Sequence, residues 1–200
     1  MKNYFLKFLI ISSFISCNLK REPQLNLTNK TNSTDYKKEI STETETFSDE
    51  DGRFEIKFPG TPTKTTQMVT TEIGKLEMIM FAYEKSLTEA FMLSYNDYPS
   101  KFIEASNIDS LLLNAREGAM QKIGIYTYDK DEKIRKNGYH GLYTKGYGNN
   151  YYIYYHIYMV GNRMYQIMAL KDGSYTNETL AADFLNSFNF VVPKNLKTND

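Results

Sequence analysis

The chain has 200 residues with 24 basic and 24 acidic side chains, one cysteine, 17 tyrosines and 12 phenylalanines. Nucleic-acid binding needs clustered Lys and Arg to displace counterions, and this balanced composition gives no such excess, so nucleic acid is not an expected partner. The single cysteine, Cys17, excludes an intrachain disulfide and a zinc site built from several cysteines. The aromatic residues supply enough apolar surface for the core of one domain of about 150 residues.

The N-terminal segment combines positive charge, a short apolar run and a small residue before the cysteine. Two lysines precede residue 8, residues 8–15 are mainly apolar, and Ser16 comes directly before Cys17. This order resembles the signal peptide of bacterial lipoproteins, with residues 14–17 as the lipobox. The resemblance implies that residues 1–16 are removed and that Cys17 carries a lipid such as palmitate, which anchors the protein to a membrane.

Two other interpretations of this segment fit less well. An ordinary secretory signal has small residues at positions −3 and −1 of its cleavage site, and Phe14 is too large for the first of these. A transmembrane helix needs about 20 apolar residues. The apolar run here has only eight, and Ser12 and Ser13 interrupt it.

The residues after the cysteine predict a location in the envelope. Asn18, rather than Asp, follows Cys17, and the resemblance to sorted lipoproteins then implies the outer membrane in a cell with two membranes. Lys20 and Arg21 differ from the acidic tail that some lipoproteins use for export to the surface. We therefore expect the domain to face the periplasm.

Composition divides the chain into four parts. We predict a signal peptide at 1–16, a lipidated cysteine with a disordered tether at 17–47, a globular domain at 48–193 and a disordered tail at 194–200. The tether is rich in Asn, Thr, Ser, Lys and Glu, and it has too few apolar residues to offset the entropy lost on ordering. Removing the signal peptide leaves 22 basic and 24 acidic side chains, a net charge of −2.

The first half of the domain reads as strands followed by a helix. Alternating apolar and polar residues, bounded by Gly and Pro, predict strands at 53–58, 67–73, 76–83 and 91–98. Phe54, Ile56 and Phe58 are expected to point inward. A helix then begins after Asn107, a favourable N-cap, and ends at Gly124. Its apolar face is expected to consist of Ile108, Leu111, Leu112, Ala115, Ala119 and Ile123.

The second half repeats this order. Strands are predicted at 125–136, 142–147, 151–160 and 163–171, and the joint at Gly161-Asn162 is typical of a two-residue hairpin. A last helix is predicted over 177–188, capped by Asn177 or Thr176. Its buried face is expected to consist of Leu180, Ala181, Phe184, Leu185 and Phe188. Hairpin-linked strands with two amphipathic helices predict an α+β domain with a mostly antiparallel sheet.

Three motifs in this order resemble one family. Residues 54–62 read F-E-I-K-F-P-G-T-P, similar to the opening F-x-V/I-x-F-P-G-x-P of bacterial PsbP-like domains. Residues 161–166 resemble their G-x-R-x-Y-Q hairpin, and residues 184–188 resemble their closing F-x-x-S-F helix. The resemblance covers about residues 50–192 and implies an α/β/α sandwich. It implies no activity, because such domains are not known as enzymes, and no ligand residue of the family maps onto this chain.

Catalytic and metal motifs give little support to an enzyme. His140 and His156 do not form an H-x-x-x-H or H-E-x-x-H pair, and there is no G-x-S-x-G motif, so we expect no metal and no cofactor. The carboxylates of Asp97, Glu104 and Asp109 are predicted to lie on different elements. A calcium loop is poorly matched, and its acidic residues are interpreted as a solvated turn or hairpin tip: Asp129, Asp131 and Glu132.

Tyrosines crowd the strand predicted at 151–160. One of its faces is apolar and is expected to lie in the core. The opposite face is amphipathic, because tyrosine hydroxyls can bond a partner while the rings pack. It is a candidate binding face for a peptide or sugar, or else a second core face beneath a helix; its residues are Tyr152, Tyr154, His156 and Tyr158.

The sequence therefore favours an envelope-anchored, non-catalytic domain that binds or scaffolds an unidentified protein or small ligand. The alternative is an envelope hydrolase or metal-dependent enzyme whose site residues are dispersed along the chain. A histidine and several acids in one deep pocket would favour the enzyme. A flat, tyrosine-rich patch without perturbed ionisable groups would favour the binding domain.

Overall fold

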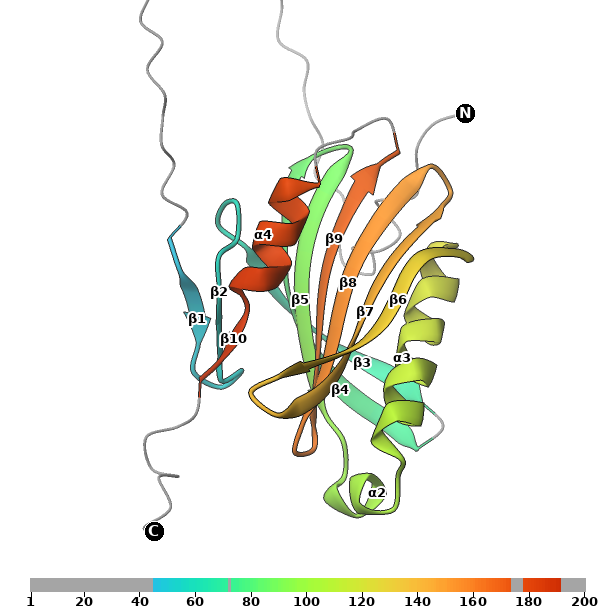
Figure 1. Ribbon diagram of the computed structural model, residues 1–200. Helices are drawn as coiled ribbons and strands as arrows, with labels where there is room; N and C mark the ends of the chain where they lie inside the picture. The colour runs from blue at the N-terminus through green and yellow to red at the C-terminus, as the bar shows by residue number, and fades with distance from the viewer. Residues whose placement is uncertain (1–44, 72, 174–177, 192–200) are drawn as a thin grey trace, which may run out of the picture. The chain divides into compact units, whose positions relative to one another are not determined.

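A seven-stranded antiparallel sheet is the central layer of the computed structural model, which describes residues 45–71, 73–173 and 178–191. The spatial order is β3-β4-β5-β9-β8-β7-β6, so β3 and β6 are its edges (Figure 1). The strands are β3 (Thr63–Thr71), β4 (Gly74–Ser86), β5 (Glu89–Asp97), β6 (Thr127–Lys136), β7 (Tyr139–Gly148), β8 (Tyr151–Val160) and β9 (Arg163–Asp172).

A second, small sheet joins the two ends of the described chain. It consists of β1 (Phe47–Asp49), β2 (Phe54–Ile56) and β10 (Asn189–Phe190), in the order β1-β2-β10. The strand predicted at 53–58 is thus present, but it pairs outside the main sheet. Phe54, Ile56 and Phe58 are 0%, 0% and 2% exposed, which confirms that they point inward.

The first long helix, α3 (Ile108–Ile123), has the predicted ends. Its first turn is capped by Asn107, whose side-chain oxygen accepts a hydrogen bond from the Ser110 amide at 2.9 Å. Gly124 ends it with φ of +73°, a conformation that glycine adopts without strain. The buried face is narrower than predicted and includes a charged residue; its members are Leu112, Arg116, Met120 and Ile123. A short helix that was not predicted, α2 (Ser100–Glu104), precedes it.

The last helix, α4 (Thr179–Ser187), begins two residues later than predicted. Its two expected capping residues, Thr176 and Asn177, lie outside the described residues. Four of the five predicted core residues are buried, namely Ala181, Phe184, Leu185 and Phe188, and Leu180 is half-buried. No helix in the part of the chain that the structure describes is long and apolar enough to cross a membrane.

The two long helices cover opposite faces of the main sheet. Tyr154 and Tyr158 belong to the same core cluster as the buried residues of α4. On the other side of the sheet, Gly148 lies against the end of α3, where a Cβ on it would be 2.3 Å from the Gly124 carbonyl oxygen. Gly148 pairs with Tyr151 of β8. Successive side chains of a strand alternate between its two faces, so Tyr154 and Tyr158 lie on the opposite face from Tyr151 and Gly148. The predicted α+β class and α/β/α layering are therefore confirmed. We call the two sides the α4 face and the α3 face.

Candidate functional site

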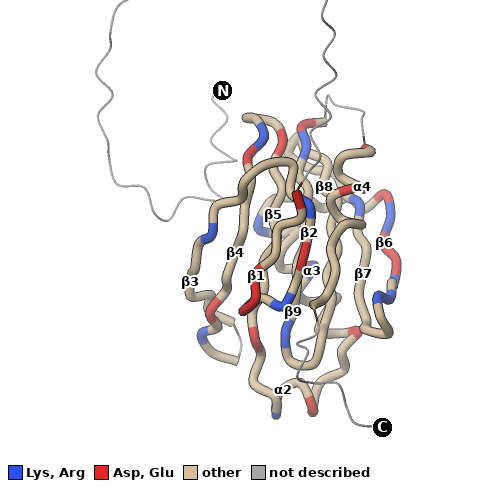
Figure 2. The backbone as a smooth tube through the Cα atoms, turned by 90° about the vertical axis from the view of Figure 1, so that its left-hand side faces the viewer, with Lys and Arg blue, Asp and Glu red and all other residues tan. Residues whose placement is uncertain are grey.

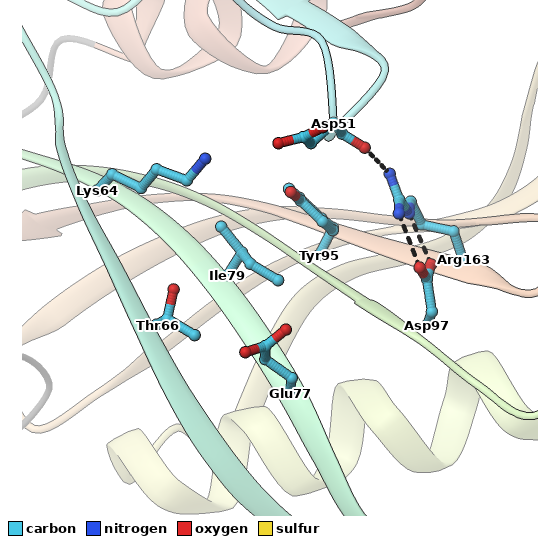
Figure 3. Close-up of a pocket in the computed structure, with 8 residues that line it drawn as sticks. All are labelled: Asp51, Lys64, Thr66, Glu77, Ile79, Tyr95, Asp97 and Arg163. Atoms are coloured by element: carbon cyan, nitrogen blue, oxygen red, sulfur yellow. Dashed lines mark hydrogen bonds and ion pairs between the residues drawn. The ribbon is translucent and has the colours of Figure 1, made fainter.

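A pocket of about 380 Å³ opens on the α4 face of the sheet, beside the turn that joins β1 to β2 (Figure 3). It lies toward the β3 edge, and its walls come from four strands of the main sheet and from that turn. Polar and charged side chains dominate the lining: Asp51, Lys64, Thr66, Glu77, Ile79, Tyr95, Asp97 and Arg163.

Strand register brings these residues together. Thr66 pairs with Ile79, and Ile79 pairs with Tyr95, so the three side chains form a row across β3, β4 and β5. Asp97 pairs with Arg163 on β9, two residues further along the same face. Because side chains alternate between the two faces, this register directs all five toward the pocket.

One wall is fixed by an ion pair with two parallel hydrogen bonds. Arg163 Nε lies 2.6 Å from Asp97 Oδ1, and Arg163 Nη2 lies 2.7 Å from Asp97 Oδ2. Arg163 Nη1 also donates to the carbonyl oxygen of Asp51, which ties the β1–β2 turn to the sheet. The bonds to Asp97 raise the pKa of Arg163, so it remains a cation at any ordinary pH. Its charge is already matched within the protein.

The floor of the pocket is Tyr95. The side chain is only 3% exposed, and its ring packs against the Arg163 guanidinium at 4.4 Å from the ring centroid. The hydroxyl makes no hydrogen bond to any residue that the structure describes, and Figure 3 shows it directed into the open space between Asp51 and Lys64. Burial, together with the nearby carboxylate of Asp49, raises the pKa of Tyr95 to about 12. The hydroxyl is therefore protonated and free to bond a ligand.

The rim of the pocket carries charge that is not matched. Lys64 Nζ lies 2.9 Å from Asp49 Oδ2 and 5.2 Å from the centroid of the Phe81 ring, so its charge is largely matched. Asp51 and Glu77 are exposed, and neither carboxylate has an ion pair or side-chain hydrogen bond among the described residues. The charge left over in the pocket is therefore negative.

The tyrosine face of β8 lies mostly in the core rather than on the surface. Tyr154 and Tyr158 are 5% and 4% exposed, and Tyr152 and His156 are half-buried. The Tyr158 ring stacks on Phe188, with ring centroids 5.9 Å apart, beneath the end of α4. If this face bound a partner, at least one of its tyrosines should be substantially exposed. None of the three is, so the packing favours the core interpretation.

One end of this face is nevertheless polar. Lys145 Nζ lies 5.6 Å and 5.7 Å from the ring centroids of Tyr152 and Tyr154, and 2.8 Å from Glu178 Oε1. Burial raises the pKa of Tyr154, with a smaller contribution from the charge of Glu178. These contacts link β7 and β8 to the start of α4.

The two histidines lie on different elements and have different surroundings. Burial lowers the pKa of His156 to about 4, and the positive charge of Lys136 adds to the effect. His140 lies on β7, and its Nδ1 is 2.8 Å from Asp109 Oδ1 at the start of α3. Neither histidine lines the pocket.

The carboxylates considered from the sequence are not brought together. Asp97 is in the pocket, Glu104 is an exposed residue of α2, and Asp109 pairs with His140 and with Lys133. Among the described residues, no group of three or more His, Cys, Asp or Glu side chains is arranged to hold a metal ion.

The acidic residues interpreted as a turn lie instead in a strand, so that interpretation was wrong. Asp129, Asp131 and Glu132 belong to edge strand β6, where Figure 2 shows acidic and basic residues following one another. Charged side chains suit an edge strand because they discourage pairing with another sheet. Asp131 also bonds the Thr144 hydroxyl at 2.7 Å and lies 3.4 Å from Arg116 of α3.

Most of the pocket was not predicted from the sequence. Asp97 was considered as a carboxylate, and Arg163 lies in the G-x-R-x-Y-Q motif, but the other lining residues are dispersed along the chain from Asp51 to Tyr95 and follow no motif. One signal was available: Asp97 and Arg163 each come at an end of a predicted strand, and each has an aromatic neighbour two positions away on the same face.

Comparison of the sequence with protein-family models and with curated proteins gives no match. Comparison of the structure with solved structures does. The domain is similar to the solution structure of cyanobacterial PsbP from Synechocystis sp. PCC 6803, with a TM-score of 0.52 and 11% sequence identity. The match covers 73% of this chain and 91% of that protein. The fold is therefore PsbP-like, as the three sequence motifs predict.

Proposed function

We propose that the protein is a lipid-anchored component of the bacterial cell envelope whose PsbP-like domain binds a small ligand without catalysing a reaction. The observation that carries the binding role is Tyr95, whose side chain is almost fully buried while its hydroxyl faces a pocket and has no hydrogen-bond partner in the described chain. Because the hydroxyl opens on the pocket, water reaches it there, and no bond within the described chain competes with a ligand for it. A ligand that bonds this group replaces that water and gains about 0.5–1.5 kcal/mol, the net value of a typical hydrogen bond.

The chemistry of the pocket supports binding rather than catalysis. General acid–base catalysis works best with a group whose pKa lies near the working pH. In the described lining, Tyr95 has a pKa of about 12, and the Arg163 cation is held by Asp97. His156, with a pKa of about 4, is a weak base and belongs to a different part of the sheet.

The alternative of a dispersed hydrolase or metal-dependent enzyme gains no specific support. It called for a histidine among several acids in one pocket, whereas the acids here are accompanied by Lys64 and Arg163. We therefore keep the binding role as the proposal.

The anchor is the second part of the proposal, and it rests on the sequence alone. We propose that Cys17 is lipidated after removal of residues 1–16, and that the domain faces the periplasm from the outer membrane where the cell has one. Cells expressing the full chain or its Cys17→Ala variant would be fed labelled fatty acid. We expect label only in the unmodified protein, and equal labelling of both would contradict the anchor.

Binding is tested separately, by the thermal stability of the full-length chain against a panel of small polar metabolites. We expect at least one compound to raise the melting temperature of the parent protein but not of Tyr95→Phe. Tyr143→Phe is the matched control, because Tyr143 is a half-buried tyrosine of the same face, outside the pocket lining, and should keep the response. A response that all three proteins share would place the binding elsewhere.

A further inference from the structure

The charges around the pocket favour a positively charged ligand over a negatively charged one. Arg163 and Lys64 are each held by a carboxylate of the protein, Asp97 at 2.6 Å and Asp49 at 2.9 Å. An anionic ligand would have to compete with one of these carboxylates for its cation. The carboxylates of Asp51 and Glu77 have no such partner in the described chain, so a cationic ligand can pair with both of them without breaking an existing ion pair.

The unpartnered hydroxyl of Tyr95 points to a ligand independently of these charges. A phenol oxygen accepts a hydrogen bond from an ammonium N–H, and the same group can donate to a hydroxyl or carbonyl oxygen. Ile79 is half-buried beside Tyr95 and offers apolar surface to a short hydrocarbon chain. The pocket thus combines negative charge, one unpartnered hydroxyl on a buried side chain and an apolar wall.

Size and donor number exclude a bare metal ion as the fitting occupant. A volume of about 380 Å³ is in the range of small-molecule sites. Calcium takes six to eight oxygen ligands and magnesium six, and two unpaired carboxylates on a rim of this size do not supply such a shell. An organic cation fills the space and needs no closed coordination shell.

We propose that this pocket binds a small aliphatic amine, with its ammonium group or groups at Glu77 and Asp51, one N–H donated to the Tyr95 hydroxyl, and its hydrocarbon chain against Ile79. This inference rests on the proposed binding function and names its ligand class. Both carboxylates are exposed, so each ion pair is weak and screened by salt. Binding should therefore weaken clearly between about 20 mM and 300 mM NaCl.

The test uses three probes of one chain length, namely 1,4-diaminobutane, 1,4-butanediol and the dicarboxylate adipate, titrated calorimetrically into the full-length protein in detergent. We expect the diamine to bind at least about tenfold more tightly than the diol, and adipate not to bind. Glu77→Gln and Asp51→Asn should each weaken diamine binding about three- to fivefold. Tyr95→Phe should weaken it at least about fivefold, because it removes a hydrogen bond to a charged group.

The matched control is Glu84→Gln. Glu84 is exposed on β4 like Glu77, but it stands on the opposite side of the pleat, so the same change of charge should leave the diamine affinity unchanged. Melting curves of every variant confirm that it folds.

The outcomes separate the ligand class from the binding site. If the diol or adipate binds as tightly as the diamine and Tyr95→Phe abolishes it, the amine inference is wrong and the pocket stands. If Glu84→Gln weakens diamine binding as much as Glu77→Gln, the effect is general surface charge and the inference also fails. If neither these probes nor the metabolite panel distinguish Tyr95→Phe from the parent, the pocket itself is not a binding site.

Discussion

The two faces of the main sheet are built from different side chains. On the α4 face the buried cluster is rich in aromatic rings, among them Phe54, Phe81, Phe91, Phe184 and Phe188. On the α3 face the strand register instead places methionines, and none of them belongs to that cluster. The methionines of this face are Met78, Met80, Met92, Met159, Met164 and Met168 on the strands, with Met120 on α3.

This difference predicts a more rigid core on the α4 face and a more adaptable one on the α3 face. Aromatic rings prefer edge-to-face or offset contacts, and the Phe91 and Phe184 rings meet at 73° with centroids 5.1 Å apart. Methionine is unbranched and flexible, so it fills irregular space at little cost when a neighbour changes. A pocket with fixed geometry is better supported by the first kind of packing, and the candidate site is indeed on the aromatic side.

Ion pairs also mark the ends of the aromatic face. Asp97 and Arg163 are cross-strand neighbours at one end of β5 and β9, and Glu89 and Lys171 are neighbours at the other. Glu89 Oε1 lies 3.2 Å from Lys171 Nζ, and both residues are nearly buried. Between these pairs the strands carry only apolar and aromatic side chains on this face. The pocket forms where the aromatic region ends and charge begins.

Among substitutions that test the difference between the two faces, Phe184→Ala should have the largest effect on stability. Phe184 is 1% exposed, and its ring centroid lies 5.0 Å from that of Phe58 and 5.1 Å from that of Phe91. Truncation should lower the free energy of unfolding by about 3–5 kcal/mol, through lost burial and a cavity that rigid rings do not refill. Urea unfolding measures it. Leu112→Ala on the α3 face should cost about 2–5 kcal/mol, and unchanged midpoints for both would remove the helices from the core.

Acid should weaken the α4 face through His156. The pKa of this residue is about 4 in the folded protein and about 6.5 when unfolded, so the folded state binds fewer protons between these values. Stability should therefore fall as the pH drops from about 6.5 to 4, by up to about 3 kcal/mol, with no further contribution below. The half-buried ring faces Tyr143 at 5.3 Å and Tyr158, and the charge of Lys136 opposes protonation.

Other groups titrate in the same range, so the His156 contribution is obtained by difference. His156→Gln should show a shallower loss of stability between pH 7 and 4 than the parent protein. His140→Gln is the control, because His140 lies outside this aromatic surrounding and bonds Asp109. The same pH slope for the parent and for His156→Gln would contradict the prediction.

A hydrogen bond from the α4 face holds the β1–β2 turn, and its loss should have a moderate effect. The Tyr165 hydroxyl donates to the Gly52 carbonyl oxygen at 2.7 Å, and this bond is buried. Tyr165→Phe keeps the ring and leaves that carbonyl without its donor, which should cost about 1–3 kcal/mol. Tyr95→Phe is the matched comparison, because its hydroxyl has no partner to lose, and it should melt within error of the parent or slightly higher. Equal destabilisation of the two variants would contradict the assignment.

Local signals explain what the sequence predicted well. The ends of α3 follow from Asn107 and Gly124, because capping depends on the chain within a few residues. Strand β8 has the predicted bounds, 151–160, because alternation and a Gly-Asn turn define it locally. The motifs at residues 54–62 and 184–188 were visible for the same reason, because each lies within one short stretch of the chain.

What was missed depends on contacts between distant parts of the chain. The pairing of β2 with β10 joins residues near both ends of the domain, and no local pattern predicts such a partner. The pocket is missed for the same reason, since Asp51 meets Arg163 only through the fold. Arg116 is buried on an otherwise apolar helix face because it forms an ion pair with Asp131 and its guanidinium lies 4.5 Å from the centroid of the Tyr128 ring. Periodicity alone assigns such a residue to the surface.

The smallest expected effects are the most informative about the two faces. Met120 and Phe91 are both fully buried, one on each face. Met120→Leu conserves side-chain volume and helix propensity, and the neighbouring methionines can adjust to the new shape. It should therefore lower the free energy of unfolding by less than about 1.5 kcal/mol. Phe91→Leu should cost more than Met120→Leu, because it also loses a ring contact worth about 0.5–1.5 kcal/mol with Phe184. Denaturant midpoints of the two variants, measured side by side, decide whether the faces differ. If both substitutions cost the same, the aromatic side is no more rigid than the methionine side, and fixed geometry cannot explain why the pocket lies where it does.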